Sequence, residues 1–181
     1  MRKCRHSTLI LICNLTIEFF ISFCGHTQFI DYDVSLGFPV EHRWHFYMSG
    51  DNKIISIVDD DPDTTELFRE AMSGVNGVTV LVFNDSLKAL KHFTDNKSEY
   101  ILVITDLRMP GIDGLQLLTK MKKTDQYLRT ILMSAYGVCN DLIIRQYLNE
   151  GIIDRFIQKP ITISSLCQEV NNQIHAYQLK M

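Results

Sequence analysis

Five short apolar segments alternate with five helical patterns from Lys53 to the end of the chain, and this alternation constrains the fold more than any other feature. The apolar segments are rich in β-branched residues, as expected of strands that helices cover on both sides. They lie at residues 54–58, 78–83, 101–105, 130–133 and 154–158. Strands that alternate with helices at nearly equal spacing predict an α/β domain with a parallel sheet.

The helical patterns carry their own start signals. Asp61 and Pro62 supply an N-cap and a first-turn proline, and Asn84 or Asp85 can cap the second helix. A fourth helix is predicted at residues 141–150. Apolar residues spaced three and four apart define the inner faces of the other helices. These are Leu67, Phe68, Ala71 and Met72 in the first, Leu87, Leu90 and Phe93 in the second, Leu115, Leu118 and Met121 in the third, and Ile163, Leu166, Val170 and Ile174 in the last.

The charges of the chain nearly balance. Its 18 Lys and Arg residues against 21 Asp and Glu residues leave a net charge of −3. Such a chain is not built to neutralise nucleic-acid phosphates, and we expect no direct nucleic-acid partner. A nucleotide- or flavin-binding module is disfavoured too, because the segment after the first strand carries acids where a glycine-rich phosphate loop would be needed.

Residues 1–47 differ in composition from the rest. They hold three of the five cysteines, four of the six histidines and the only tryptophan. Their apolar run, residues 9–24, is shorter than the roughly 20 residues that cross a bilayer, and it contains Asn14 and Glu18. We therefore expect residues 1–47 to be a poorly ordered extension or an over-extended gene start, with a membrane anchor as the weaker alternative. Residues 48–181 are expected to form the folded domain.

Polar side chains follow four of the five predicted strands. The first ends in Asp59, Asp60 and Asp61, the third in Asp106, the fourth in Ser134 and the fifth in Lys159. Because ligands of parallel sheets bind at the carboxyl ends of strands, these residues should meet at one edge. Clustered carboxylates favour a hard divalent cation, and a lysine and a serine can hold phosphoryl oxygens. The set predicts a phosphoryl-transfer site with an aspartate nucleophile.

Taken together, these motifs resemble the receiver domain of two-component response regulators over residues 52–177. Residues 58–61 are similar to the acidic pair after the family's first strand, and residues 106–114 to its phosphoacceptor loop. Lys159 and Pro160 match the family's Lys-Pro pair, which is usually joined by a cis peptide bond. The resemblance implies a flavodoxin-like, doubly wound (βα)5 parallel sheet with strand order 2-1-3-4-5.

The resemblance also assigns roles to the acidic residues. Asp106 is the implied phosphoacceptor, which would be converted to 4-aspartylphosphate. Asp59, Asp60 and Asp106, with the main-chain carbonyl of Arg108, are the implied ligands of Mg²⁺. A hydrolase of the phosphatase type with an aspartate nucleophile is the alternative. Such enzymes carry a second acid two residues after the nucleophile, where this chain has Arg108.

Three further residues have roles implied by the resemblance. Lys159 and Ser134 complete the catalytic set with Asp106. Ser134 and Phe156 form the implied switch, because the phosphoryl group would draw Ser134 inward and let Phe156 turn into the vacated space. The face formed by the fourth helix, the fifth strand and the fifth helix would then change. Tyr136 suggests a second hypothesis, that a bulky side chain shields the phosphoryl group and slows its hydrolysis.

The predicted function is therefore that of a single-domain response regulator in a Mg²⁺-dependent phosphorelay, a switch rather than a turnover enzyme. The implied partners are a sensor histidine kinase or phosphotransfer protein and a downstream protein target. A phosphorylation-dependent homodimer is compatible with this function. We expect a cytoplasmic location with no membrane partner, because the phosphodonor is cytosolic.

Overall fold

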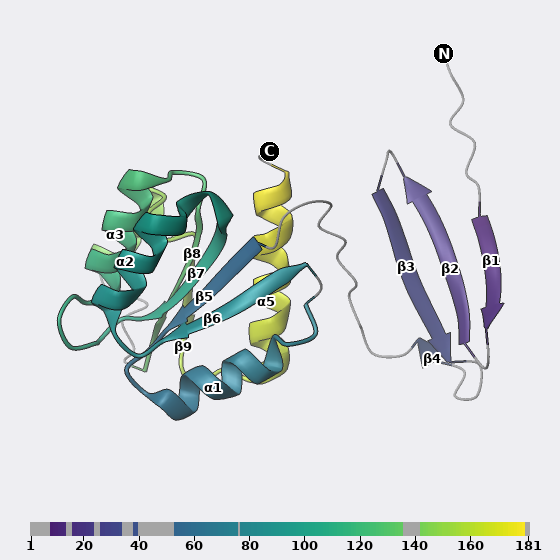
Figure 1. Cartoon of the computed structure of the whole chain (residues 1–181), viewed down its shortest axis with the longest axis horizontal. Coiled ribbons are helices and arrows are strands. Elements are labelled where there is room, and N and C mark those ends of the chain that lie inside the picture. The colour runs from purple at the N-terminus through teal and green to yellow at the C-terminus, as the bar shows by residue number, and fades with distance from the viewer. Residues whose placement is uncertain are drawn as a thin grey trace, which may run out of the picture. The chain divides into compact units, whose positions relative to one another are not determined.

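The computed structural model describes secondary structure for residues 8–13, 16–23, 26–33 and 38–39. It describes backbone and side chains for residues 53–75, 77–135 and 142–179. The chain divides into two units, Met1–Tyr47 with Gly74–Asn76 and Met48–Ser73 with Gly77–Met181. Figure 1 shows both units with their helices and strands labelled. Among the helices of the described residues, none is long and apolar enough to cross a bilayer.

The first unit carries an antiparallel sheet of its own, in the order β1-β2-β3-β4. Its strands are β1 (Thr8–Cys13), β2 (Thr16–Phe23), β3 (His26–Asp33) and β4 (Phe38–Pro39). This sheet is separate from the sheet of the second unit. The expectation that residues 1–47 are a poorly ordered extension or an over-extended gene start stays a prediction.

The second unit is built on a parallel five-stranded sheet. Its strands are β5 (Lys53–Val58), β6 (Val78–Phe83), β7 (Tyr100–Asp106), β8 (Arg129–Ser134) and β9 (Arg155–Gln158). They are ordered β6-β5-β7-β8-β9, which is the order 2-1-3-4-5 in this unit (Figure 1). The prediction of a flavodoxin-like sheet is confirmed. The central strand β7 is the most deeply buried, with no exposed side-chain surface from Ile101 to Thr105.

Helices cover both faces of this sheet. They are α1 (Pro62–Ala71), α2 (Ser86–Asn96), α3 (Gly114–Thr124), α4 (Leu142–Asn149) and α5 (Ile163–Gln178), with a 3-10 turn at Lys97–Glu99. In Figure 1, α1 lies beside α5 on one side and α2 beside α3 on the other. Side chains cap four of the helices at their first turns, where main-chain N–H groups lack helical partners. The caps are Asp61, Asp85, Asp113 and Thr162.

Three apolar residues predicted to face the core are exposed instead. Leu67, Leu87 and Ile163 keep 52%, 57% and 36% of their surface accessible. The buried stripe starts two residues earlier in α1 and one residue earlier in α2, at a small hydroxyl residue in each case. They consist of Thr65, Phe68 and Met72, and of Ser86, Ala89 and Phe93. The inward hydroxyl groups bond main-chain carbonyls, that of Thr65 to Pro62 at 2.9 Å and that of Ser86 to Pro110 at 3.3 Å. Apolar spacing alone therefore misplaced the stripes.

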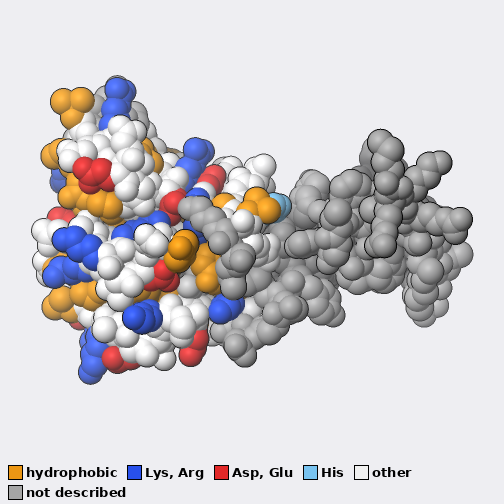
Figure 2. Space-filling model, turned by 90° about the horizontal axis from the view of Figure 1, so that it is seen from above, with side chains coloured by type: hydrophobic (Ala, Val, Ile, Leu, Met, Phe, Trp, Pro, Cys, Tyr) orange, Lys and Arg blue, Asp and Glu red, His pale blue; other side chains and the backbone are white. Residues whose placement is uncertain are grey.

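The surface of the second unit carries charges of both signs. On the face drawn in Figure 2, basic, acidic and apolar side chains are interspersed over the described residues. This mixture follows from the near balance of basic and acidic residues in the sequence. The expectation that the chain binds no nucleic acid stays a prediction.

Candidate functional site

Three charged side chains meet at the carboxyl edge of the sheet. The ammonium nitrogen of Lys159 lies 2.6 Å from Asp59 Oδ2 and 2.6 Å from Asp106 Oδ1. Asp59 follows β5, Asp106 ends β7 and Lys159 follows β9, so residues from three strands form one cluster. The sequence predicts that the residues at the strand ends meet at one edge, and Asp59, Asp106 and Lys159 do so.

The cluster is electrostatically unbalanced. Asp59 is 2% exposed, and its carboxylate and that of Asp106 share one ammonium group. Burial acts to lower the pKa of Lys159, but hydrogen bonds to Asp106 and Asp59 and the attraction of both carboxylates outweigh it and raise that pKa. Lys159 therefore stays charged at neutral pH. Two carboxylates against one cation leave a negative charge and oxygen donors that suit Mg²⁺.

The Asp59 carboxylate and main chain are held in place from two sides. The main-chain N–H of Asp61 donates to Asp59 Oδ1 at 3.0 Å. The side-chain amide of Asn84 donates to the main-chain carbonyl of Asp59 at 2.8 Å and to Thr65 Oγ1 at 3.1 Å. Asn84 therefore ties the end of β6 to the acidic turn and to α1. Sequence analysis considered it only as a helix cap, a role that Asp85 fills.

Both oxygens of Asp106 are engaged. Its Oδ1 accepts from Lys159, and its Oδ2 accepts from the main-chain N–H of Arg108 at 2.7 Å. The side chain keeps 13% of its surface accessible, so it is fixed yet reachable from solvent. The following residue, Leu107, donates its main-chain N–H to the carbonyl of Met133 at 2.8 Å, which anchors the loop to β8.

Gly114 allows α3 to begin close to Asp106. A Cβ at this position would lie 2.2 Å from the main-chain oxygen of Asp106 and 2.9 Å from Leu132 Cδ1. Since ordinary van der Waals contacts are longer than about 3.4 Å, only glycine fits here. Gly111 in the same loop has a φ of +86°, which favours glycine for a different reason. The sequence predicts a loop rich in glycine and proline here, but not this close approach of two main-chain segments.

The three neighbouring acids differ in their surroundings. Asp60 is exposed. Asp61 caps α1, and its carboxylate accepts from Thr64 Oγ1 at 2.6 Å and from Asp63 N at 3.0 Å. Hydrogen bonds from the Thr64 hydroxyl and, to a lesser extent, from the Asp63 main-chain N–H lower the pKa of Asp61.

Among the residues whose side chains are described, no three His, Cys, Asp or Glu side chains are grouped as a metal site. The predicted ligand set includes a main-chain carbonyl, that of Arg108.

The two predicted switch residues lie near the same edge. Ser134 is 1% exposed, and its main-chain carbonyl accepts from the N–H of Lys159 at 2.8 Å. Phe156 is half-buried and packs against the core. The Lys159–Pro160 peptide bond is cis, as the resemblance implied. Tyr136, invoked for the lifetime of a phosphoryl group, lies outside the described residues.

Comparison with known families decides what kind of domain carries this cluster. The model of the response regulator receiver domain matches residues 55–171, which is more than half of the chain. The chain belongs to the receiver-domain family. Receiver domains are the phosphorelay switches of two-component systems, so the family prediction made from strand-end residues is confirmed.

Individual relatives match about two thirds of the chain. It is 31% identical over 123 residues to sporulation initiation phosphotransferase F of Bacillus subtilis, which covers 68% of this chain and 94% of that protein. It is 30% identical over 125 residues to the DNA-binding transcriptional regulator NtrC of Escherichia coli, covering 69% of this chain. The chain spans only 25% of the length of NtrC. The similarity to NtrC is thus confined to one part of that regulator.

Two solved structures of response regulators are similar to this chain. A receiver domain protein from Clostridium thermocellum is 27% identical with a TM-score of 0.63, over 71% of this chain and 99% of that one. Response regulator protein TrrA from Thermotoga maritima, solved in complex with Mg(2+)-BeF, is 30% identical with a TM-score of 0.56, over 67% of this chain and 98% of that one. Both comparisons support the fold described above.

Proposed function

We propose that Asp106 accepts a phosphoryl group from the phosphohistidine of a sensor histidine kinase or phosphotransfer protein and becomes 4-aspartylphosphate. The observation that carries this proposal is the shared ammonium of Lys159 between Asp59 and Asp106, at 2.6 Å from each. The bond from phosphorus to an Asp106 oxygen forms as the bond to the imidazole nitrogen breaks. The imidazole, protonated on its other nitrogen, leaves as the neutral ring.

The main roles of the chain's own groups follow from their positions. Lys159 is charged and already touches Asp106, so it is placed to bind an oxygen of the transferred group. The main-chain N–H of Arg108 holds one Asp106 oxygen and so orients the carboxylate before attack. Ser134, buried beside this edge on β8, is proposed to bind a second phosphoryl oxygen through its hydroxyl.

The residues present fit a magnesium ion. We propose that Asp59, Asp60, Asp106 and the main-chain carbonyl of Arg108 would hold it, because they offer hard oxygen donors next to an uncompensated negative charge. When bound, Mg²⁺ neutralises charge that develops on phosphoryl oxygens. Receiver domains bind Mg²⁺ as a family, and TrrA was solved in complex with Mg(2+)-BeF.

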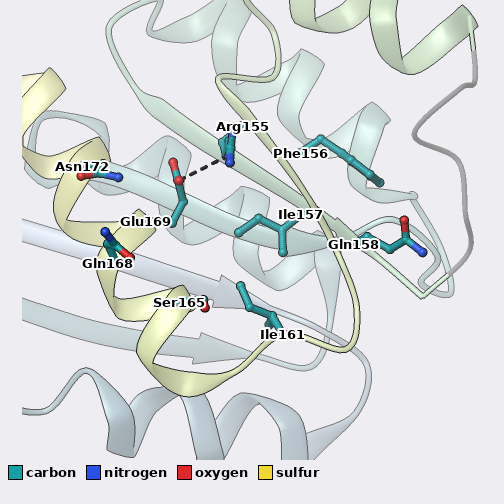
Figure 3. Close-up of a pocket in the computed structure, with 9 residues that line it drawn as sticks. All are labelled: Arg155, Phe156, Ile157, Gln158, Ile161, Ser165, Gln168, Glu169 and Asn172. Atoms are coloured by element: carbon teal, nitrogen blue, oxygen red, sulfur yellow. Dashed lines mark ion pairs between the residues drawn. The ribbon is translucent and has the colours of Figure 1, made fainter.

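We propose that the signal leaves through the face formed by α4, β9 and α5. Ser134 lies at the end of β8, whose neighbour β9 carries Phe156, so a movement of one is transmitted to the other within the sheet. Figure 3 draws Phe156 on the side of β9 away from α5. A downstream protein, or a second phosphorylated copy of this chain, would bind to this face. The proposal places the chain in the cytoplasm, with its phosphodonor.

The test is to incubate the full chain with acetyl phosphate and Mg²⁺ and to map the adduct by mass spectrometry. We expect one acid-stable, base-labile phosphoryl group on Asp106, and none in Asp106→Asn. Asp95→Asn, which removes an exposed carboxylate on α2, is the matched control and should be labelled like the parent. Labelling of another residue would refute the assignment. Steady turnover of an added phosphomonoester would instead support the hydrolase, in which Arg108 occupies the place of the second acid.

A further inference from the structure

A groove of about 430 Å³ runs between β9 and α5. Four consecutive residues of β9, from Arg155 to Gln158, line it. Because successive side chains of a strand point to opposite faces of the sheet, a groove lined by four in a row follows the edge of the strand. In the described part of the chain β9 pairs only with β8, so this edge is open. An open strand edge offers main-chain N–H and C=O groups to a partner.

The opposite wall is a polar stripe on α5. Figure 3 shows Ser165, Gln168 and Asn172 on this helix beside β9. These side chains are uncharged, and their amide and hydroxyl groups can bond peptide groups. Ser165 and Asn172 are about 10 Å apart along the helix axis, since each helical residue rises about 1.5 Å. An extended chain covers that distance in about three residues. The groove therefore has the length and the chemistry for a short extended peptide.

Arg155 supplies a charge at this groove. Its side chain is 59% exposed, and its Nε lies 3.3 Å from Glu169 Oε2. That contact is an ion pair without hydrogen-bond geometry, and the Arg155 side chain makes no hydrogen bond within the described residues. A guanidinium group with hydrogen-bond donors still available is suited to bind a carboxylate in the bidentate manner typical of arginine.

Buried groups hold the partner of Arg155 in position. The side-chain amide of Gln173 donates to Glu169 Oε1 at 2.7 Å. Gln173 in turn accepts from Arg129 Nε and one terminal nitrogen at 2.9 and 2.6 Å. The other terminal nitrogen of Arg129 lies 2.7 Å from Asp154 Oδ1, which is 10% exposed. Glu169 is thus fixed from behind, and it limits where the Arg155 guanidinium can lie.

Two charged side chains line the groove, Arg155 and Glu169, and they differ in exposure. The Arg155 side chain keeps 59% of its surface accessible, and that of Glu169 keeps 14%. The other polar side chains of the groove are neutral. The charge that the groove presents to a partner is therefore mainly positive, and charge complementarity favours an acidic occupant over a basic one.

We propose that the groove between β9 and α5 binds an extended acidic segment of a partner protein, which adds to the open edge of β9 as a further strand and places a carboxylate on Arg155. Main-chain hydrogen bonds to β9 would supply affinity, and the carboxylate would supply selectivity. A free anion would leave the stripe of amides unused. The inference rests on the proposal that the α4–β9–α5 face carries the signal.

The test uses the full chain, unphosphorylated and labelled with ¹⁵N. The probe is a blocked six-residue peptide of alternating valine and glutamate, compared with its glutamine counterpart and with free glutarate. We expect changes of amide chemical shift in β9 and α5. We also expect about tenfold tighter binding of the glutamate peptide, because the extra strength of a charge-assisted hydrogen bond over a neutral one corresponds to about that factor in affinity. Glutarate should bind far more weakly than the peptide.

Two variants decide the role of the guanidinium. Arg155→Gln should reduce the affinity for the glutamate peptide to that for the glutamine peptide. Arg69→Gln, which also removes an exposed arginine paired with a glutamate, should leave it unchanged. Equal affinities of the two peptides, an unchanged affinity in Arg155→Gln, shifts confined to other elements, glutarate binding as tight as the peptide, or no binding would each overturn the proposal. Labelling of Asp106 is measured separately in Arg155→Gln, so a failure of phosphoryl transfer is distinguished from a failure of the groove.

Discussion

The close approach of α3 to the candidate phosphoacceptor makes Gly114→Ala a stringent test of the site geometry. The added Cβ would lie 2.2 Å from the main-chain oxygen of Asp106, more than 1 Å inside an ordinary contact of about 3.4 Å. The oxygen belongs to the main chain and the position of a Cβ is fixed by the main chain, so neither atom can turn away as the end of a flexible side chain could. Overpacking of this kind costs about 2–3 kcal/mol. In a chain of this size that lowers the thermal midpoint by about 4–12 °C.

The same displacement should reach the chemistry, because the main chain that moves is that of Asp106. We expect slower labelling by acetyl phosphate at temperatures where Gly114→Ala is still folded. Gly74→Ala is the matched control, since its added Cβ would meet nothing within 4 Å. It should keep the midpoint and the labelling of the parent. A Gly114→Ala variant with the parent's midpoint and labelling rate would refute the geometric argument.

Three further predictions address other parts of the chain. Asp154→Asn should lower the free energy of unfolding by about 3 kcal/mol or more, because it removes the carboxylate that two buried cations share. Urea titration measures this free energy, and the control Glu66→Gln, in an exposed ion pair, should change it little. Asp60→Asn should weaken Mg²⁺ binding, followed by calorimetry, without changing the thermal midpoint; unchanged affinity would exclude Asp60 as a ligand. A chain that starts at Met48 should keep its midpoint and its labelling by acetyl phosphate, and loss of either would show that residues 1–47 stabilise the domain.

The sheet could be predicted from sequence because its signals are local. Each strand is a short β-branched run, and the observed strands differ from the predicted ones by only a residue or so at their ends. The buried faces of α1 and α2 could not be predicted in the same way from apolar spacing. Thr65 and Ser86 can occupy buried positions because their hydroxyl groups bond main-chain carbonyls, that of Pro62 in the first turn of α1 and that of Pro110 in a loop. Hydropathy ranks both residues below the leucines near them.

The site shows the same division. Asp59, Asp106 and Lys159 could be found because each directly follows or ends a predicted strand, and parallel strands share one carboxyl edge. Asn84 and Gly114 could not, because their roles depend on atoms of other elements. The amide of Asn84 matters through the carbonyl of Asp59, 25 residues earlier, and Gly114 matters through the space that Asp106 leaves. No spacing rule encodes such contacts.

The span bridged by Lys159 has a consequence for the assembly of the protein. Asp59 and Asp106 come from the adjacent strands β5 and β7, but Lys159 follows β9, which is separated from β7 by β8. To reach Asp106 and Asp59, the lysine therefore joins positions two and three strand spacings from its own strand, about 10 and 14 Å. During synthesis the two carboxylates emerge first, and they lack their cation until the last strand has joined the sheet. The charge arrangement proposed to accept a phosphoryl group thus arises only in a chain whose sheet is complete.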